Sequence, residues 1–236
     1  MRNFVACPVV RDTASVPCWL AEYQGELYFL TLQADVSAPV NPPWLGHKVL
    51  VEGRRSDKPR ICGGIVLEPV RLSVIAEQDA SCNQMLPAEE RYNLTFEPPR
   101  PPGPSGGRLA FNTLPMPVKA VEVKREPQHY TLNYDFNALV GFKHPFVLAP
   151  ALEMAKTLPA TRVQIVGYRS AALLSDGTVL QERPDLARRR AEQVAELLRG
   201  AGLVAPRYEV SWVDAAAAPD GADDYRSRRV DITLLP

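Results

Sequence analysis

The sequence lacks several features that would assign a function directly. No apolar run approaches the roughly 20 residues that span a bilayer, and the first residues lack the basic start and apolar stretch of a signal peptide. Basic and acidic residues balance at 27 each among 236 residues, so no net charge attracts a polynucleotide or an anionic membrane. We therefore expect a chain with no transmembrane segment and no nucleic-acid partner.

Motifs for catalysis, cofactors and metals are also missing. The histidines, His47, His129 and His144, have no serine or cysteine nucleophile signature beside them. The glycine pairs in ICGGIV and PSGGR lack the lysine and the helix of a phosphate-binding loop. The acidic residues of VDAAAAPDGADD lack the alternating spacing of a calcium loop. The sequence therefore predicts a protein that is not an enzyme and that uses no cofactor or metal.

What the sequence does have is a group of four cysteines in its first third, Cys7, Cys18, Cys62 and Cys82. None has the CxxC spacing of a zinc site, and no histidine lies near enough to complete a ligand set. An even number in one small region predicts two disulfides, with free buried thiols as the alternative, and disulfides persist in oxidising compartments. Three pairings are open, of which Cys7–Cys18 with Cys62–Cys82 closes the shortest loops. We therefore expect a periplasmic or cell-surface protein, with association to the outer membrane left open.

The first of these cysteines has a second interpretation. The stretch FVAC that ends at Cys7 resembles the box before a lipidated cysteine in bacterial lipoproteins, although the apolar stretch that should precede it is missing. Lipidation of Cys7 therefore stays open as the alternative to a disulfide.

Residues 1–95 are predicted to form a small all-β domain. Gln24-Gly25 is typical of a hairpin turn between two short strands. Glycine, proline and the loop RRSDKPR separate the expected strands, which cover residues 19–23, 27–32, 47–52, 61–67 and 70–75. Five short strands favour an OB-like barrel or a sandwich.

Aromatic and basic residues of this first domain are candidates for a ligand-binding face of the kind that OB folds carry. They are Trp19, Tyr23, Tyr28, Trp44, Arg54 and Arg55. Aromatic residues that alternate along strands more often fill a core, so we expect a structural role for them and keep ligand binding as the alternative.

A change of composition marks the domain boundary. Residues 96–127 begin with FEPPRPPGPSGG, which cannot sustain a helix or a central strand, and they are predicted to form a Pro/Gly-rich linker and strap. In residues 128–236, strands alternate with helices. Strands are expected at 129–136, 162–168, 208–213 and 228–234, and helices at 150–158 and 184–200. We read this as a β-α-β-α-β-β order, which makes the whole chain α+β, with a C-terminal two-layer sandwich.

The second of these helices carries an arginine in an unusual place. Pro184 suits the first turn and Gly200 marks the end. At about 100° per residue, Arg190 falls inside the apolar stripe that faces the core. A buried guanidinium is costly unless it is paired. Arg190 is therefore either a structural residue whose head reaches water or a carboxylate, or a group that waits for the carboxylate of a ligand.

Three motifs in residues 128–236 resemble those of the OmpA-like peptidoglycan-binding domain. Members of that family carry a strand that ends in Gly-His/Tyr-Thr-Asp, then a helix with Leu-Ser-x-x-Arg-Ala-x-x-Val, then a closing strand that begins Asn/Asp-Arg-Arg-Val-Glu-Ile. The corresponding stretches here are GYRS at 167–170, LARRRAEQV at 186–194 and SRRVDI at 227–232. The resemblance covers less than half of the chain.

The resemblance implies a ligand and the residues that bind it. In the family, the aspartate takes the ammonium group and the helix arginine takes the carboxylate of the diaminopimelate in peptidoglycan. By position, Arg190 matches the helix arginine, Arg228 and Arg229 match the closing pair, and Ser170 stands where the aspartate belongs, after Tyr168 and Arg169. A serine hydroxyl supplies no charge to oppose an ammonium group.

The segment between the first motif and the helix is longer than in the family and contains Asp176-Gly177. Asp176 is a candidate replacement for the missing aspartate, although Asp-Gly pairs are typical of hairpin tips. Because the carboxylate is missing, we expect a structural or protein-interaction component of the envelope whose peptidoglycan binding is weakened or lost, and whose partners are other envelope proteins. The alternative is an anchor that binds peptidoglycan through Arg190, Arg228 and Arg229.

Overall fold

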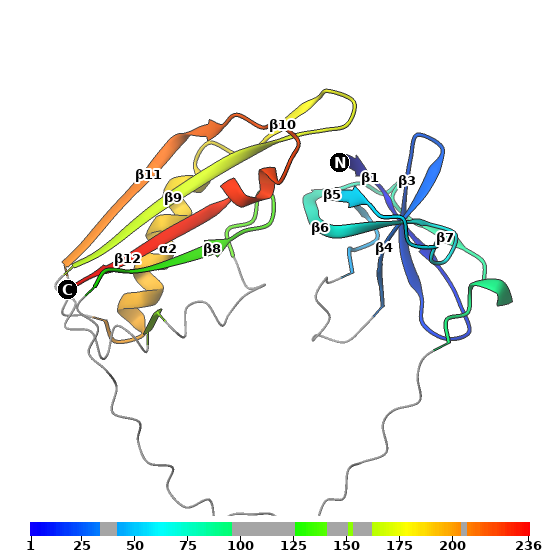
Figure 1. Cartoon of the computed structure of the whole chain (residues 1–236), viewed down its shortest axis with the longest axis horizontal. Coiled ribbons are helices and arrows are strands. Elements are labelled where there is room, and N and C mark those ends of the chain that lie inside the picture. The colour runs from blue at the N-terminus through cyan, green and yellow to red at the C-terminus, as the bar shows by residue number, and fades with distance from the viewer. Residues whose placement is uncertain (34–41, 96–125, 141–150, 153–161, 204–206) are drawn as a thin grey trace, which may run out of the picture.

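The computed structural model describes residues 1–33, 42–95, 126–140, 151–152, 162–203 and 207–236. Figure 1 shows two sheets, one from each part of the chain. The linker expected at 96–127 and the helix expected at 150–158 lie almost wholly outside the described residues. Within the described part, no helix has the length and apolar character needed to cross a membrane.

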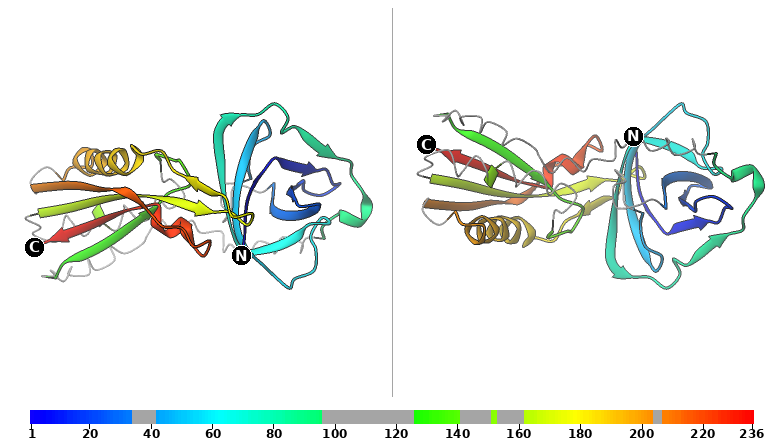
Figure 2. Two further views of the ribbon diagram at one scale, coloured as in Figure 1. Left: turned by 90° about the horizontal axis from the view of Figure 1, so that it is seen from above. Right: turned by 90° about the horizontal axis from the view of Figure 1, so that it is seen from below.

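The N-terminal part forms one mixed sheet of seven strands, in the order β1-β5-β6-β4-β3-β2-β7. A short 3₁₀ helix, η1 (Glu90–Tyr92), follows the sheet. The strands are β1 (Arg2–Ala6), β2 (Pro8–Arg11), β3 (Cys18–Tyr23), β4 (Glu26–Leu32), β5 (His47–Arg55), β6 (Ile65–Gln78) and β7 (Gln84–Leu86). The sheet curls on itself (Figure 2). Apolar side chains from most of its strands form one core cluster.

The predicted hairpin at Gln24-Gly25 is confirmed, because β3 and β4 pair antiparallel across it and both residues have positive φ angles. The prediction of separate strands at 61–67 and 70–75 is wrong, because β6 runs through Pro69. The pairing of β5 with β6 shifts register between Gly53 and Arg55, which face this proline. A register shift tolerates the missing N–H of proline. The OB-like barrel is not confirmed.

Two disulfides are present, as the cysteine count predicted, but they do not close the shortest loops. Cys7 pairs with Cys82, and Cys18 pairs with Cys62. Since the sheet brings the ends of distant strands together, each bond links segments far apart in sequence. The sulfur of Cys7 is occupied by Cys82 and is not free to carry a lipid.

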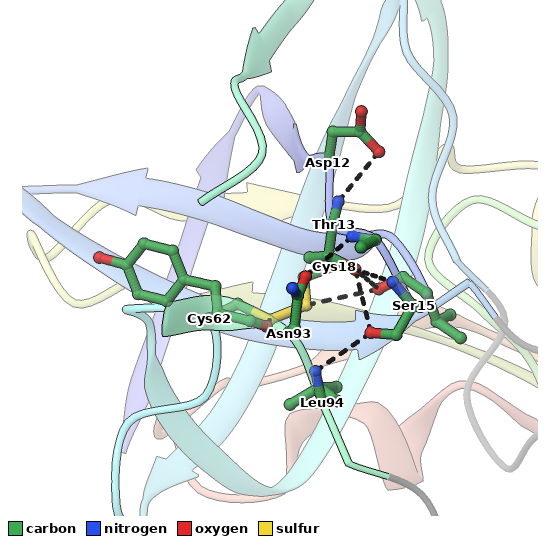
Figure 3. The surroundings of a disulfide bond; sticks show 10 residues. Asp12, Thr13, Ser15, Cys18, Cys62, Asn93 and Leu94 are labelled. Carbon is green, nitrogen blue, oxygen red and sulfur yellow. Dashed lines mark hydrogen bonds between the residues drawn. A yellow bond between two sulfur atoms is a disulfide. The ribbon is translucent and has the colours of Figure 1, made fainter. Parts of the chain in front are cut away.

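Hydrogen bonds hold the end of the N-terminal part beside the Cys18–Cys62 bond (Figure 3). The side chain of Asn93 accepts a bond from the Ala14 N–H at 2.8 Å, and the hydroxyl of Ser15 accepts one from the Leu94 N–H at 3.1 Å. Residues 93 and 94 are therefore fixed against the loop before β3.

The C-terminal part is a sheet covered on one face by a helix. Strand β9 (Arg162–Leu173) is central and pairs with β11 (Arg207–Ala217), β12 (Arg229–Leu235) and the short β10 (Val179–Gln181), while β8 (Gln128–Asn133) pairs with β12. The helix α2 (Leu186–Gly200) packs its apolar stripe on β9, β11 and β12, and η2 (Asp224–Ser227) precedes β12. These strands and this helix confirm the main elements that the sequence predicts after residue 128.

The strand does not end at the GYRS motif of residues 167–170, as the resemblance implies, and Gly167 makes no turn. It lies within β9, and the strand continues to Leu173. A Cβ atom added to Gly167 would lie 2.0 Å from the carbonyl oxygen of Ala187 in α2. The glycine is needed because the helix backbone passes directly over the strand.

The two parts of the chain share a core and several hydrogen bonds. Leu50 of β5 packs in one apolar cluster with Phe136 and Ala172. Asn3 donates from its side chain to the carbonyl oxygens of Leu173 at 3.1 Å and Gly221 at 2.9 Å. Both views in Figure 2 show the β9–β10 hairpin and η2 directed at the strands of the N-terminal part. The contact places residues of both parts around the candidate site.

Candidate functional site

The site begins with Arg190, which α2 places against the sheet. Its side chain is 0% exposed, although it matches the ligand-binding arginine of the resemblance. Its Nε donates to the carbonyl oxygen of Ala138 at 2.9 Å, and its Nη atoms donate to those of Tyr168 at 3.2 Å and Asp135 at 3.3 Å. Three backbone carbonyl oxygens thus accept hydrogen bonds from the guanidinium.

The remaining acceptor of Arg190 is the carboxylate of Glu182, just after β10. Its two oxygens accept from the Nη atoms of Arg190 at 2.7 Å and 3.0 Å, in a bidentate ion pair with both side chains 0% exposed. An arginine carries five N–H groups, and five acceptors are present. Arg190 therefore has no donor left for a ligand carboxylate.

Glu182 is equally well satisfied. Besides the guanidinium, its oxygens accept from the backbone N–H groups of Asn137 and Ser170, both at 2.9 Å. Charged groups pay a large desolvation cost on burial unless hydrogen bonds compensate it. The four hydrogen bonds to the Glu182 carboxylate compensate the desolvation cost of its burial.

Ser170 and Tyr134 complete the surroundings of this pair. Ser170 is 1% exposed, and its hydroxyl donates to the carbonyl oxygen of Ala171 or Asp224. The Ser170 hydroxyl is therefore hydrogen-bonded within the chain. The guanidinium of Arg190 lies 4.6 Å above the ring of Tyr134. Burial raises the pKa of Tyr134 to about 12, against the opposing effect of the Arg190 charge.

Asp176 lies away from this pair, at the tip of the β9–β10 hairpin. Its carboxylate accepts from the N–H of Thr178 at 2.9 Å, and Gly177 has a φ of +87°. This is the hairpin tip that Asp-Gly favours. The carboxylate that faces Arg190 comes from Glu182, six residues later in the chain.

Arg228 lies at the contact between the two parts of the chain. Its Nη1 donates to Oε1 of Glu52 at 3.2 Å, and its Nη2 donates to Oε2; the two side chains are 1% and 3% exposed. Burial raises the pKa of the Glu52 carboxyl, and the Arg228 charge opposes this shift. Glu52 belongs to β5, so the N-terminal part supplies the partner of this arginine.

Arg229 and Tyr168 lie together on the face of the sheet opposite α2. Val230 and Ile232 point into the core beneath the helix, and side chains alternate along a strand. The Arg229 guanidinium lies 4.2 Å above the ring of Tyr168 and donates to Asp231 at 2.9 Å. The five predicted ligand-binding residues thus separate into three places.

Most of the aromatic candidates in the N-terminal part belong to its core. Trp19 and Tyr28 are buried, and the ring of Tyr23 stacks on Phe4 with the centroids 4.6 Å apart. Trp44 is 65% exposed. Arg54 and Arg55 are exposed at the end of β5. The structural role expected for the strand aromatics is confirmed for Trp19 and Tyr28.

Glu182 and Glu52 are residues of the candidate site that the sequence did not identify. The position of Arg190 on the apolar stripe left water, a carboxylate of the chain and a ligand carboxylate open as its acceptor, and both Glu182 and Asp185 are near enough in sequence to be that carboxylate. Glu52 lies 176 residues from Arg228. No local pattern connects the members of either pair.

Comparisons with known proteins address the fold alone. No protein-family model and no curated protein matches the chain. Among solved structures, the chain is similar to a MotB-like protein from Desulfovibrio vulgaris, with 17% identity, a TM-score of 0.36 and coverage of 46% of this chain and 75% of that one. It is also similar to the OmpA-like domain of FopA1 from Francisella tularensis, with 16% identity, a TM-score of 0.35 and coverage of 47% and 73%. The second of these carries the family name that the motifs of residues 128–236 suggest.

Proposed function

We propose that the chain is a non-enzymatic component of the bacterial cell envelope, in which an OmpA-like fold serves a structural or protein-interaction role and peptidoglycan binding is weakened or lost. The observation that carries this proposal is the state of Arg190. All five of its N–H groups have acceptors within the chain, and Glu182 supplies the carboxylate that the resemblance expects from a ligand.

The other arginines of the resemblance support the same conclusion. Arg228 is buried against Glu52, and Arg229 lies on the opposite face of the sheet from α2, paired with Asp231. An ammonium group needs an opposing carboxylate, but Ser170 supplies none and its hydroxyl is engaged. The alternative, an anchor that binds peptidoglycan through Arg190, Arg228 and Arg229, requires two buried ion pairs to open.

A pull-down with purified peptidoglycan sacculi tests the proposal. We expect the intact chain to stay in the supernatant, as does the control Glu192→Ala, which removes an exposed glutamate of α2 that pairs with Arg188. Sedimentation of the intact chain with sacculi, reversed by free diaminopimelate, would establish the anchor instead. Glu182→Ala shows what closes the site: if this variant alone sediments, Glu182 is the group that excludes the ligand.

The envelope location is part of the same proposal. It is supported by the disulfides Cys7–Cys82 and Cys18–Cys62, since such bonds persist in oxidising compartments. Titration of thiols in the denatured, unreduced protein should detect none. Four reactive thiols would remove this argument for the periplasm or cell surface.

A further inference from the structure

A group of hydrogen-bond donors without acceptors lies where the two parts of the chain meet. A small cavity there is lined by residues of β6, of β8 and the segment after it, and of η2 and the residue that follows, among them Arg71, Asn133, Tyr225 and Arg228. A wider groove shares three of them, Arg71, Asn133 and Tyr225, and opens onto the face of the sheet opposite α2. The shared residues place the cavity, which has room for about one water-sized atom, beside the inner end of this groove.

The donors around this cavity are unmatched within the described part of the chain. Arg71 lies with its guanidinium 4.3 Å above the ring of Tyr225 and makes no ion pair with any described residue. The Nε atom of Arg228 is buried and has no hydrogen-bond partner among the residues described. A buried N–H without an acceptor costs free energy. The inner end of the groove thus lacks an oxygen acceptor.

The charge of the surroundings defines the class of ligand. The wider groove is also lined by Arg226 and Arg229, and each of these pairs with one aspartate, Asp223 or Asp231. Arg71 adds a positive charge that no carboxylate opposes within ion-pair distance among the described residues. The acidic residues at the inner end are Glu52, which already pairs with the Nη atoms of Arg228, and Asp135, which lines the small cavity. An anionic group that brings its own oxygens complements such a site.

We propose that Arg71, Asn133, Tyr225 and the Nε of Arg228 form a binding site for an oxyanion, a carboxylate or a phosphate group carried by a ligand that lies along the groove. The Arg71 guanidinium supplies the charge, the Asn133 amide and the Tyr225 hydroxyl supply further donors, and Arg228 completes the inner end. The site uses neither Arg190 nor Glu182, so it stands independently of the proposal that Glu182 closes the position beside α2.

NMR titration of the intact chain with inorganic phosphate and, separately, with acetate tests the site, with chloride at the same ionic strength as the reference. We expect saturable shifts of the Asn133 side-chain amide and of the backbone amides of Arg71 and Tyr225. Arg71→Gln should weaken binding about tenfold or more, as loss of a charged hydrogen-bond partner does. The control Arg188→Gln makes the same change of charge on the exposed face of α2 and should leave the affinity unchanged.

The titrations distinguish results that support the oxyanion site from results that contradict it. Saturation by one anion alone identifies the chemistry of the ligand, and saturation by both supports the shared oxyanion site. Non-saturating shifts with both anions, or equal weakening by Arg71→Gln and Arg188→Gln, would overturn the site. Tyr225→Phe keeps the ring beneath Arg71 and removes only the hydroxyl. It therefore gives a second test should Arg71→Gln alter the folded spectrum: weaker binding supports the site, and unchanged binding in both variants contradicts it.

Discussion

The buried pair of Arg190 and Glu182 makes a prediction about stability that can be worked out from its contacts. Arg190→Met would leave the Glu182 carboxylate buried without its cation and would remove donors from three backbone carbonyl oxygens. Removing one partner of a buried ion pair costs about 3–5 kcal/mol. We expect Glu182→Leu to cost a similar amount, because it leaves a buried guanidinium uncompensated.

The double variant Arg190→Met/Glu182→Leu should cost less than the sum of the two single variants, since it leaves no unpaired charge. The difference, measured by urea unfolding, should be about 2–3 kcal/mol, near the upper end for coupled residues. Arg188 and Glu192 provide the matched control on the same helix, because they form an exposed pair with side chains 47% and 46% exposed. Their coupling should be only about 0.3–0.5 kcal/mol.

A coupling below about 1 kcal/mol for the buried pair would refute the reasoning. Such a value would mean that Arg190 is solvated in the folded chain and has donors available for a ligand. The proposal that Glu182 closes the family's binding position would then fail together with the stability argument.

Three further predictions concern other parts of the chain. Gly167→Ala should destabilise by about 3 kcal/mol or more in thermal unfolding, because its Cβ would meet a carbonyl oxygen of α2 at 2.0 Å; Gly200→Ala, which meets open space, is its control. Hydrogen bonds from Ser81, then Lys48, lower the pKa of Asp79 to about 2, so Ser81→Ala should raise the pKa seen by carboxyl NMR toward 3.8, and an unchanged value would contradict the assignment. Burial raises the pKa of Glu52 above 4.5. The protonated Glu52 carboxyl therefore contributes to stability below pH 4.5, and this contribution is lost as the pH rises through the pKa of the folded state. Glu52→Gln should remove this part of the pH dependence of the free energy of unfolding.

The pH prediction for Glu52 also reports on the contact between the two parts. The carboxyl is buried because β5 meets Arg228. If wild type and Glu52→Gln show the same pH dependence of unfolding, Glu52 is solvated and the contact differs from the one described. The contact is thus open to test separately from the fold of either part.

The sequence by itself determined the elements whose signals are local. The turn at Gln24-Gly25 needs only a tolerance for positive φ angles, and α2 follows from its apolar period and its terminal residues. The number of cysteines predicted two disulfides. The motifs of residues 128–236 carried the family resemblance. These features depend on residues close together in the chain, where short-range sterics and periodicity decide the conformation.

Tertiary structure alone decided the features that depend on distant residues. The disulfide pairing follows from which strands lie side by side, and Gly167 matters because a helix crosses it rather than because the chain turns there. Arg190 on the apolar stripe required an acceptor, but only the fold selected Glu182. A buried charge must be neutralised by a group that the packing brings within about 3 Å. The spacing of residues along the sequence does not predict which group that is.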